Sequence, residues 1–258
     1  MIFIFKKFLA FTIGIFIVGG IFSVSARSLP PDTPKPQPVK ENILTHKHSA
    51  ACDETTAEPV QIICILDRSG SMRKLAEDTI GGYNSFLEKQ KQNPGKAEVT
   101  TILFDDQYEI ISESVDINET KELTSAEYFA RGTTALLDAV GRTVTNTLGK
   151  MEKEKVCPEK RRVLIMIMTD GLENASKEYK KSDVKKLIDA TTKNYNWNYV
   201  FIGANMDSVS EAKSLGISAR NAANYSHDSG GVQKSFSMMD AAANEVREKG
   251  TVGDDWKK

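Results

Sequence analysis

The chain has 258 residues, of which 40% are hydrophobic and 27% are charged, a composition typical of one globular domain with an additional segment. Lys and Arg total 34 against 35 for Asp and Glu, so the formal net charge of -1 gives no electrostatic reason to expect nucleic acid as a partner. The three cysteines are too few for a disulfide scaffold, and their spacing matches no zinc-binding pattern.

Residues 1–28 differ in composition from the rest of the chain. Lys6 and Lys7 precede a run without charge, FLAFTIGIFIVGGIFSV (residues 8–24), and this order is typical of a signal peptide or membrane anchor. The run is long for a signal-peptide core and short for a spanning helix, so a cleaved signal and an uncleaved anchor both fit. Both place the lysines on the inner side of the membrane, and we therefore expect an exported, extracytoplasmic domain that is membrane-anchored or secreted.

Residues 29–58 are predicted to form a linker. Five of the eight prolines lie in residues 29–40, LPPDTPKPQPVK, which favours an extended, hydrated spacer. His46, His48 and Cys52 follow in a polar stretch, where a solvated loop is a simpler interpretation than a metal site. We expect the folded domain at 59–250 and a tail at 251–258.

From residue 59 onward, short apolar runs alternate with amphipathic stretches. In chain order we predict a buried strand at 60–66, a helix at 80–92, a strand pair at the sheet edge at 99–104 and 108–115, a long helix at 134–153, a second buried strand at 162–169, a helix at 182–195, a strand at 197–203, a helix at 207–215, a short strand at 217–223 and a closing helix at 231–249. Strands that alternate with helices imply a doubly wound, Rossmann-like α/β fold with a mostly parallel sheet and helices on both faces.

Polar residues follow both buried strands at the point where each strand ends. Ligands of open α/β sheets bind beyond the carboxyl ends of the strands, so these residues are the first candidates for a site. A carboxylate and two hydroxyls alternate in the turn after the first buried strand, a second carboxylate follows the other, and a threonine opens the long helix. The candidates are Asp67, Ser69, Ser71, Asp170 and Thr134.

These residues and their order resemble the von Willebrand factor type A (vWA) family, whose motif is DxSxS, then a threonine, then an aspartate after a later buried strand. The threonine position has two candidates, and Thr134, followed by ALLDA, fits the family's loop and helix better than Thr133. The resemblance runs from about Val60 to about Lys249, and short bacterial and phage members of the family are the most similar. The N-terminal export segment is an addition to their pattern.

The resemblance implies a metal-ion-dependent adhesion site (MIDAS) and protein binding without catalysis. Hydroxyls and carboxylates suit Mg²⁺, with Mn²⁺ or Ca²⁺ as alternatives, and Mg²⁺ takes about six oxygen ligands. In the family the Ser and Thr oxygens generally bind the ion directly, whereas the aspartates often act through water. This leaves a position for an Asp or Glu carboxylate of a partner protein. The membrane would be a further partner if the N-terminal segment is not cleaved.

Two other functions remain open. A vWA domain can serve as a cytoplasmic adaptor for an AAA ATPase in a stress-response system, and residues 1–28 argue against that compartment. A metal-dependent hydrolase of the haloacid dehalogenase type would need an aspartate at the position of Ser69, and no P-loop or GxSxG motif is present. His227 lies just before the closing helix, where a loop or capping role is expected.

The resemblance also bears on the cysteines. In the family fold the strands that begin near Val60 and Arg162 are adjacent and parallel, so Cys52 and Cys157 both precede the same edge of the sheet. In an oxidising compartment we expect them to form a disulfide, and we expect Cys64, inside a buried strand, to remain a free thiol.

Overall fold

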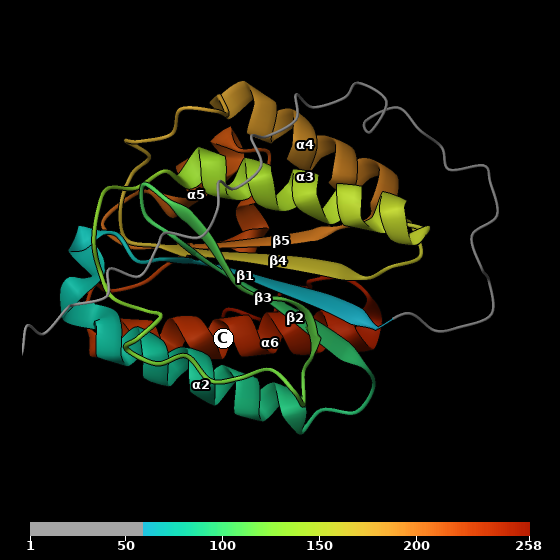
Figure 1. Cartoon of the computed structure of the whole chain (residues 1–258), viewed down its shortest axis with the longest axis horizontal. Helices are drawn as coiled ribbons and strands as arrows, with labels where there is room; N and C mark the ends of the chain where they lie inside the picture. Colours follow the sequence, from blue (N-terminus) through green and yellow to red (C-terminus); the bar gives the residue numbers. More distant parts are fainter. Residues whose placement is uncertain (1–58) are drawn as a thin grey trace, which may run out of the picture. The chain divides into compact units, whose positions relative to one another are not determined.

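A computed structural model describes residues 59–258, which form a six-stranded sheet between two layers of helices (Figure 1). The strand order is β3-β2-β1-β4-β5-β6, and only β3 runs antiparallel to its neighbour. The strands are β1 (Val60–Asp67), β2 (Ala97–Phe104), β3 (Tyr108–Asp116), β4 (Val163–Thr169), β5 (Asn198–Gly203) and β6 (Ala222–Asn224).

The helices cover the two faces of the sheet unequally. Helices α2 and α6 pack on one face and α3, α4 and α5 on the other (Figure 1). The helical segments are the 3₁₀ turn η1 (Gly70–Leu75), α2 (Ala76–Lys91), α3 (Leu136–Glu154), α4 (Lys181–Tyr195), α5 (Ser208–Ser214), the 3₁₀ turn η2 (Ala219–Asn221) and α6 (Ser229–Lys249). This arrangement confirms the predicted doubly wound α/β class.

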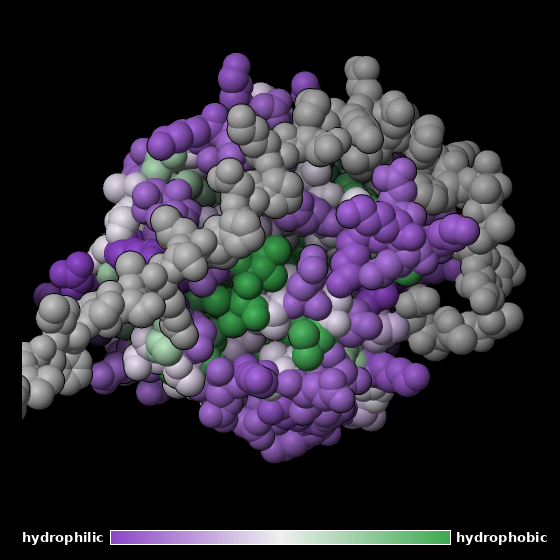
Figure 2. All heavy atoms as spheres, viewed as in Figure 1, coloured by the Kyte–Doolittle hydropathy of each residue, from purple (hydrophilic) through white to green (hydrophobic). Residues whose placement is uncertain are grey.

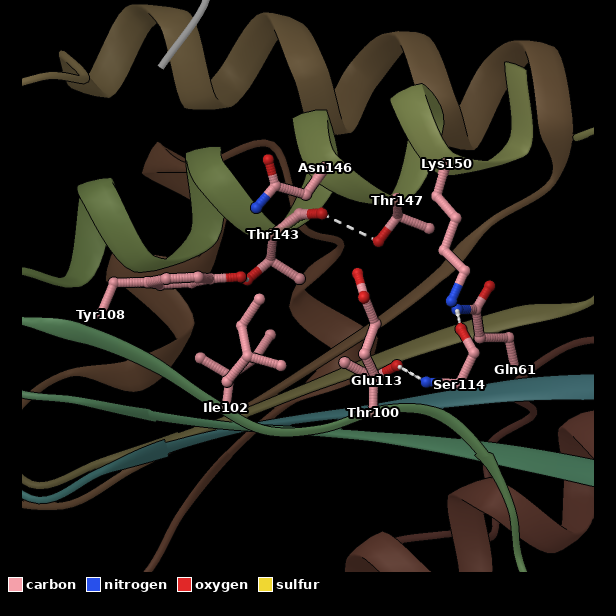
Figure 3. A pocket seen from close by; sticks show the side chains of 11 residues that line it. Gln61, Thr100, Ile102, Tyr108, Glu113, Ser114, Thr143, Asn146, Thr147 and Lys150 are labelled. Carbon is pink, nitrogen blue, oxygen red and sulfur yellow. Dashed lines mark hydrogen bonds between the residues drawn. The ribbon is translucent and has the colours of Figure 1, made fainter. Parts of the chain in front are cut away.

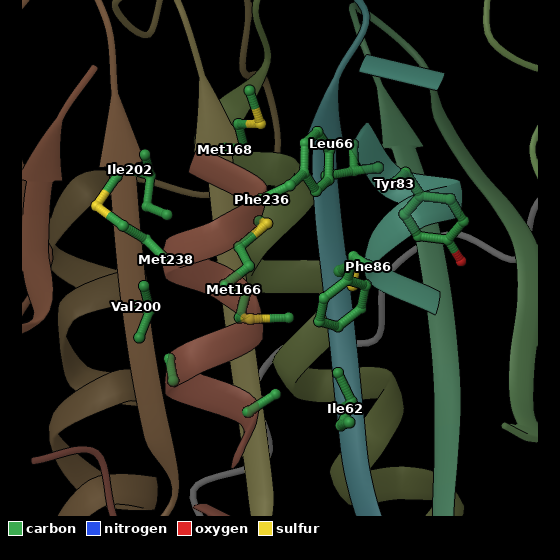
Figure 4. Packing of buried hydrophobic residues seen from close by; sticks show 14 of the residues in the cluster. Ile62, Leu66, Tyr83, Phe86, Met166, Met168, Val200, Ile202, Phe236 and Met238 are labelled. Atoms are coloured by element: carbon green, nitrogen blue, oxygen red, sulfur yellow. The ribbon is translucent and has the colours of Figure 1, made fainter. Parts of the chain in front are cut away.

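The core lies on both faces of the central strands. Every residue of β1 and β4 is buried, and alternate side chains point to opposite helix layers. Figure 4 shows aromatic side chains of α2 and α6 lying over β1 and β4. Helices α2 and α6 approach closely at Gly82. A Cβ at this position would lie 2.2 Å from the ring of Phe236, so the contact requires glycine. The near-continuous apolar runs of the sequence are therefore the two strands buried on both faces.

Strand β3 is the least covered strand. Within residues 59–258 it pairs only with β2, its register shifts between Val99 and Ile102 of β2, and its residues are half-buried or exposed. Hydrophobic side chains gather over this part of the surface (Figure 2), and Ile110 is 41% exposed. The predicted strand pair at the sheet edge is confirmed.

Three boundaries differ from the predictions. The first helix begins at Ala76 and is preceded by η1, whereas helix was predicted only from residue 80. The last strand covers only Ala222–Asn224 instead of 217–223, because only three of its residues pair with β5 and the preceding residues form η2. Residues 251–258, predicted to be a tail, contribute Val252 and Trp256 to the core, and Trp256 Nε1 donates to the Arg220 carbonyl at 3.2 Å.

The predictions for the N-terminal part lie outside the described residues. These are the signal or anchor segment at 1–28, the linker at 29–58, and His46, His48 and Cys52. Between residues 59 and 258 no helix is long and apolar enough to cross a membrane. Cys157 is disulfide-bonded, and Cys64 is a free buried thiol whose pKa burial raises to about 12.

Candidate metal site

The five predicted site residues all lie at the carboxyl edge of the sheet. Strand β1 ends at Asp67, and the chain then turns into η1 with Ser69 and Ser71. Strand β4 lies beside β1 in parallel, with Leu66 paired to Met168, so Asp170 emerges at the same edge. Thr134 lies two residues before α3. All but Ser71 are at most 3% exposed, although each lies where a strand or loop ends.

Four of the five residues form a hydrogen-bonded chain. The Asp67 carboxylate accepts from the Ser69 N–H at Oδ1 and from the Thr169 hydroxyl at Oδ2, both at 2.6 Å. The Ser69 and Ser71 hydroxyl oxygens are 3.1 Å apart, and Ser71 Oγ donates to Asp170 Oδ1 at 2.6 Å. The structure thus brings together two carboxylates and two hydroxyls. Ser71 and Asp170, which are in direct contact, are 99 residues apart in the sequence.

Backbone hydrogen bonds to Asn174 hold Thr134 in place beside this group. Its N–H donates to Asn174 Oδ1 at 2.9 Å, and its carbonyl accepts from the Asn174 N–H at 3.0 Å. Its hydroxyl oxygen lies 3.2 Å from the position that a Cβ on Gly171 would take, so it lies beside the residue that follows Asp170. Thr133 is exposed. The choice of Thr134 over Thr133 stays a prediction.

The loops that carry the site are tied to one another. The Tyr128 hydroxyl donates to the Asp67 carbonyl at 2.5 Å, and the Gly70 N–H donates to the Gly132 carbonyl at 3.2 Å. On the other side, the Asp138 carboxylate of α3 accepts the backbone N–H groups of Lys177, Glu178 and Tyr179. These bonds hold three separate loops in one arrangement, which is what a preorganised site requires.

The electrostatics of the site are one-sided. Burial raises the pKa of Asp67 from 3.8 to about 6, against the opposite effect of its hydrogen bonds, and the charge of Asp170 raises it further. Within residues 59–258 no lysine or arginine forms an ion pair with either carboxylate. The two acids are therefore buried with hydroxyls, one backbone N–H and one imidazole as partners.

That imidazole belongs to His227, which the sequence did not identify as a site residue. Its Nε2 lies 2.7 Å from Asp170 Oδ2. The helix-capping role expected for this segment belongs to its neighbour Asp228, whose Oδ1 accepts from the Gly231 N–H at 2.7 Å. No local pattern could have revealed the contact, since 57 residues separate His227 from Asp170.

The donor set fits a hard divalent cation. Among the described residues no three His, Cys, Asp or Glu side chains are close enough to hold a metal ion by themselves, so an ion at this site would depend on hydroxyl oxygens as well. Carboxylate and hydroxyl oxygens are the donors that Mg²⁺ and Ca²⁺ prefer. The donor set would hold Mg²⁺ or Mn²⁺ more readily than a metal that requires sulfur.

A hollow elsewhere on the molecule is not a competing site. It lies between β3 and α3 and is lined by polar side chains that include Tyr108, Glu113 and Lys150 (Figure 3). It has room for about one water molecule, which is too little for a substrate. The carboxyl edge of the sheet is therefore the better candidate.

Comparisons with known proteins agree with the fold. No protein-family model and no curated protein matches the chain. Among solved structures, it is similar to proximal thread matrix protein 1 from the mussel byssus, with 13% identity and a TM-score of 0.52 over 72% of this chain and 48% of that chain. A von Willebrand factor type A structure from Catenulispora acidiphila matches with 14% identity and a TM-score of 0.49 over 73% and 43%.

A third similar structure is the manganese-loaded TRAP protein of Plasmodium vivax, with 18% identity and a TM-score of 0.46 over 70% of this chain and 74% of that chain. The chain spans a little under half the length of the first two proteins. Together with the strand order, the similarity to proximal thread matrix protein 1 supports the doubly wound α/β fold.

Proposed function

We propose that this domain binds an acidic side chain of a partner protein through a divalent cation held by Asp67, Ser69, Ser71, Thr134 and Asp170. One observation carries the proposal: two buried carboxylates meet at the carboxyl edge of the sheet, joined by serine hydroxyls, and no lysine or arginine among residues 59–258 balances them. Buried charges of one sign are costly unless a counter-charge is present. A divalent cation supplies that charge.

Each side chain has a defined part in this arrangement. Ser71 donates its proton to Asp170 and therefore accepts from the Ser69 hydroxyl, which leaves one lone pair of its oxygen available to an ion. The hydroxyls of Ser69 and Thr134 add oxygen donors without adding charge. Asp67 and Asp170 together balance the two positive charges of the cation. A cation with six ligands would keep a coordination position for a carboxylate from outside. Mg²⁺ is our first choice, with Mn²⁺ and Ca²⁺ as alternatives.

We assign no catalytic role to the site. Its side chains are carboxylates that would hold the ion, hydroxyls that would hold the ion, and an imidazole that already faces Asp170. A hydrolase of the dehalogenase type would need a second aspartate where Ser69 stands. An adaptor function for an ATPase could use the same metal chemistry in the cytoplasm, and the apolar run at residues 8–24 favours an exported location.

The first test measures the metal alone. Mg²⁺ and Mn²⁺ are titrated calorimetrically into the full chain, into Asp67→Ala and into Asp254→Ala, a control that removes a carboxylate 79% exposed in its ion pair with Arg220. We expect binding by the wild type and the control, and a loss of at least about 100-fold in Asp67→Ala. Equal affinity in all three proteins would show that the site is assigned wrongly.

The second test measures the outside carboxylate. With Mn²⁺ bound, water-proton relaxation is followed while acetyl-Gly-Glu-Gly-amide or acetyl-Gly-Gln-Gly-amide is added. We expect the glutamate peptide to displace bound water and the glutamine peptide to have no effect, since only the carboxylate can enter the coordination sphere as an anion. If the glutamate peptide binds as well in EDTA as with the metal, binding is not metal-bridged.

A further inference from the structure

His227 is held against Asp170 by a compact turn. It lies between β6 and α6, three residues after the end of β6 and two before the first residue of α6. Its Nε2 lies 2.7 Å from Asp170 Oδ2, and the imidazole is 26% exposed, so most of the ring is covered by the protein. Asp170 itself is shielded from solvent, with no exposed side-chain surface.

The turn that carries His227 is locally specified. Asp228 caps α6 and its N–H donates to the Ser226 carbonyl at 2.7 Å. Gly231 is necessary for this packing, because a Cβ there would lie 1.8 Å from the Ser226 carbonyl oxygen. The Tyr225 N–H donates to the Gly203 carbonyl at the end of β5 at 2.9 Å. His227 is therefore placed by backbone contacts on both sides.

The chemistry of the pair defines the direction of the hydrogen bond. An ionised carboxylate can only accept, so Nε2 must carry the proton that faces Asp170. Asp170 then accepts one hydrogen bond at each oxygen, from Ser71 at Oδ1 and from His227 at Oδ2. Two donors from different loops fix the plane of the carboxylate, which a single donor would leave free to rotate.

We propose that His227 is a positioning residue of the metal site, which orients Asp170 by donating a hydrogen bond from Nε2. This inference rests on the proposed function, because Asp170 matters here as a metal ligand or as the acceptor of a metal-bound water. Groups that hold ligating carboxylates in place commonly contribute 10- to 100-fold to metal affinity. His227 supplies that contribution from the turn before α6, a segment that carries none of the DxSxS, Thr or Asp motif residues.

The test separates the hydrogen bond from the shape of the ring. His227→Phe keeps a ring of similar size without a donor, and His227→Gln keeps an N–H donor without a ring. We expect Mg²⁺ affinity to fall at least about 10-fold in His227→Phe and to stay within a few-fold of wild type in His227→Gln. Ser226→Ala changes the exposed neighbour and should leave affinity unchanged. Circular dichroism and thermal midpoints confirm that each variant is folded.

Several results would overturn the inference. Equal Mg²⁺ affinity in wild type and His227→Phe, or equal losses in His227→Phe and His227→Gln, would show that the donor is not important. A loss confined to Zn²⁺, with Mg²⁺ and Mn²⁺ unaffected, would identify His227 as a direct nitrogen ligand instead. Asp67→Ala distinguishes failure of the proposed function from failure of the inference about His227. If Asp67→Ala binds metal as well as wild type, the proposed function fails, and the inference about His227 fails with it.

Discussion

Asp67 and Arg68 are adjacent at the end of β1, yet they enter two buried polar clusters of opposite character. In the arginine cluster, Arg68 Nε lies 3.2 Å from Asp105 Oδ2, Arg131 Nε lies 2.7 Å from the same oxygen, and Arg68 Nη2 lies 2.6 Å from Glu109 Oε2. Two cations there face two carboxylates. The carboxylate cluster, formed by Asp67, Ser69, Ser71, Asp170 and His227, has two acids and no arginine or lysine.

The difference separates a structural cluster from one built for a ligand. Arg68 and Asp105 have no exposed side-chain surface, and each is compensated inside the protein. The carboxylate cluster is equally buried, but the metal-free protein leaves Asp67 with a pKa raised to about 6. A buried charge must be paired or neutralised. In the arginine cluster the buried charges are paired within the protein. In the carboxylate cluster they are neutralised only when a proton or a cation binds.

The largest expected effect comes from breaking the arginine cluster. Arg68→Met leaves Asp105 with one cation and Glu109 with a weaker partner, and losing one member of a buried ion pair typically costs about 3–5 kcal/mol. The free energy of unfolding, measured in urea, should fall by that amount. Arg142→Met is the control, because its ion pair with Glu178 is partly exposed and should contribute about 1 kcal/mol or less. Similar losses in both variants would contradict the distinction between a buried and a surface pair.

Removing a charge from the carboxylate cluster should raise the free energy of unfolding of the metal-free protein, whereas removing Arg68 should lower it. Because the folded pKa of Asp67 is above its ordinary value, ionisation is disfavoured in the folded protein, and metal-free stability should decline as pH rises from about 4 to about 6. The difference between the ordinary pKa of Asp67 and about 6 corresponds to about 3 kcal/mol at most. Asp67→Asn should therefore stabilise the metal-free domain by about 1–3 kcal/mol at pH 7.5 and have little effect at pH 4.

That comparison is made by urea unfolding in EDTA at both pH values. Asp254→Asn, which alters an exposed carboxylate, should change nothing at either pH. Mg²⁺ should be absent from Asp67→Asn at any pH and should bind the wild type more tightly as pH rises through about 6, since the ion requires the ionised carboxylate. If Asp67→Asn is less stable than wild type at pH 7.5, the hydrogen bonds of the Asp67 carboxylate stabilise the fold more than the burial of its charge destabilises it, and the prediction is wrong.

The two clusters also show what could be predicted from sequence. The strands buried on both faces are continuous apolar runs, and the DxSxS turn and Asp170 follow them within a few residues. Their meeting then follows from the parallel pairing of adjacent strands. Thr134 was predicted from the family motif. In the structure its backbone N–H and carbonyl are hydrogen-bonded to Asn174.

The remaining contacts depend on distances along the chain that no local pattern encodes. His227 lies three residues after β6 and contacts Asp170, from which 57 residues separate it in the sequence. The burial of Arg68 depends on Asp105 and Glu109 from the strand pair at the sheet edge. Trp256 enters the core after the last helix, where a tail was predicted. In each case tertiary packing decides the role of a residue whose neighbours in sequence are uninformative.

The smallest expected effect concerns the threonine. Thr134→Ala should change the free energy of unfolding by less than about 1 kcal/mol, because the bonds that place this residue are made by its backbone and Asn174. Mg²⁺ affinity should fall only a few-fold, since water can replace one neutral oxygen donor. We expect the glutamate peptide to lose more affinity than the metal does. Thr133→Ala, at an exposed position, should alter neither value. A larger loss of Mg²⁺ binding in Thr133→Ala than in Thr134→Ala would reverse the assignment of the threonine, while leaving Asp67, Ser69, Ser71 and Asp170 to be judged by their own variants.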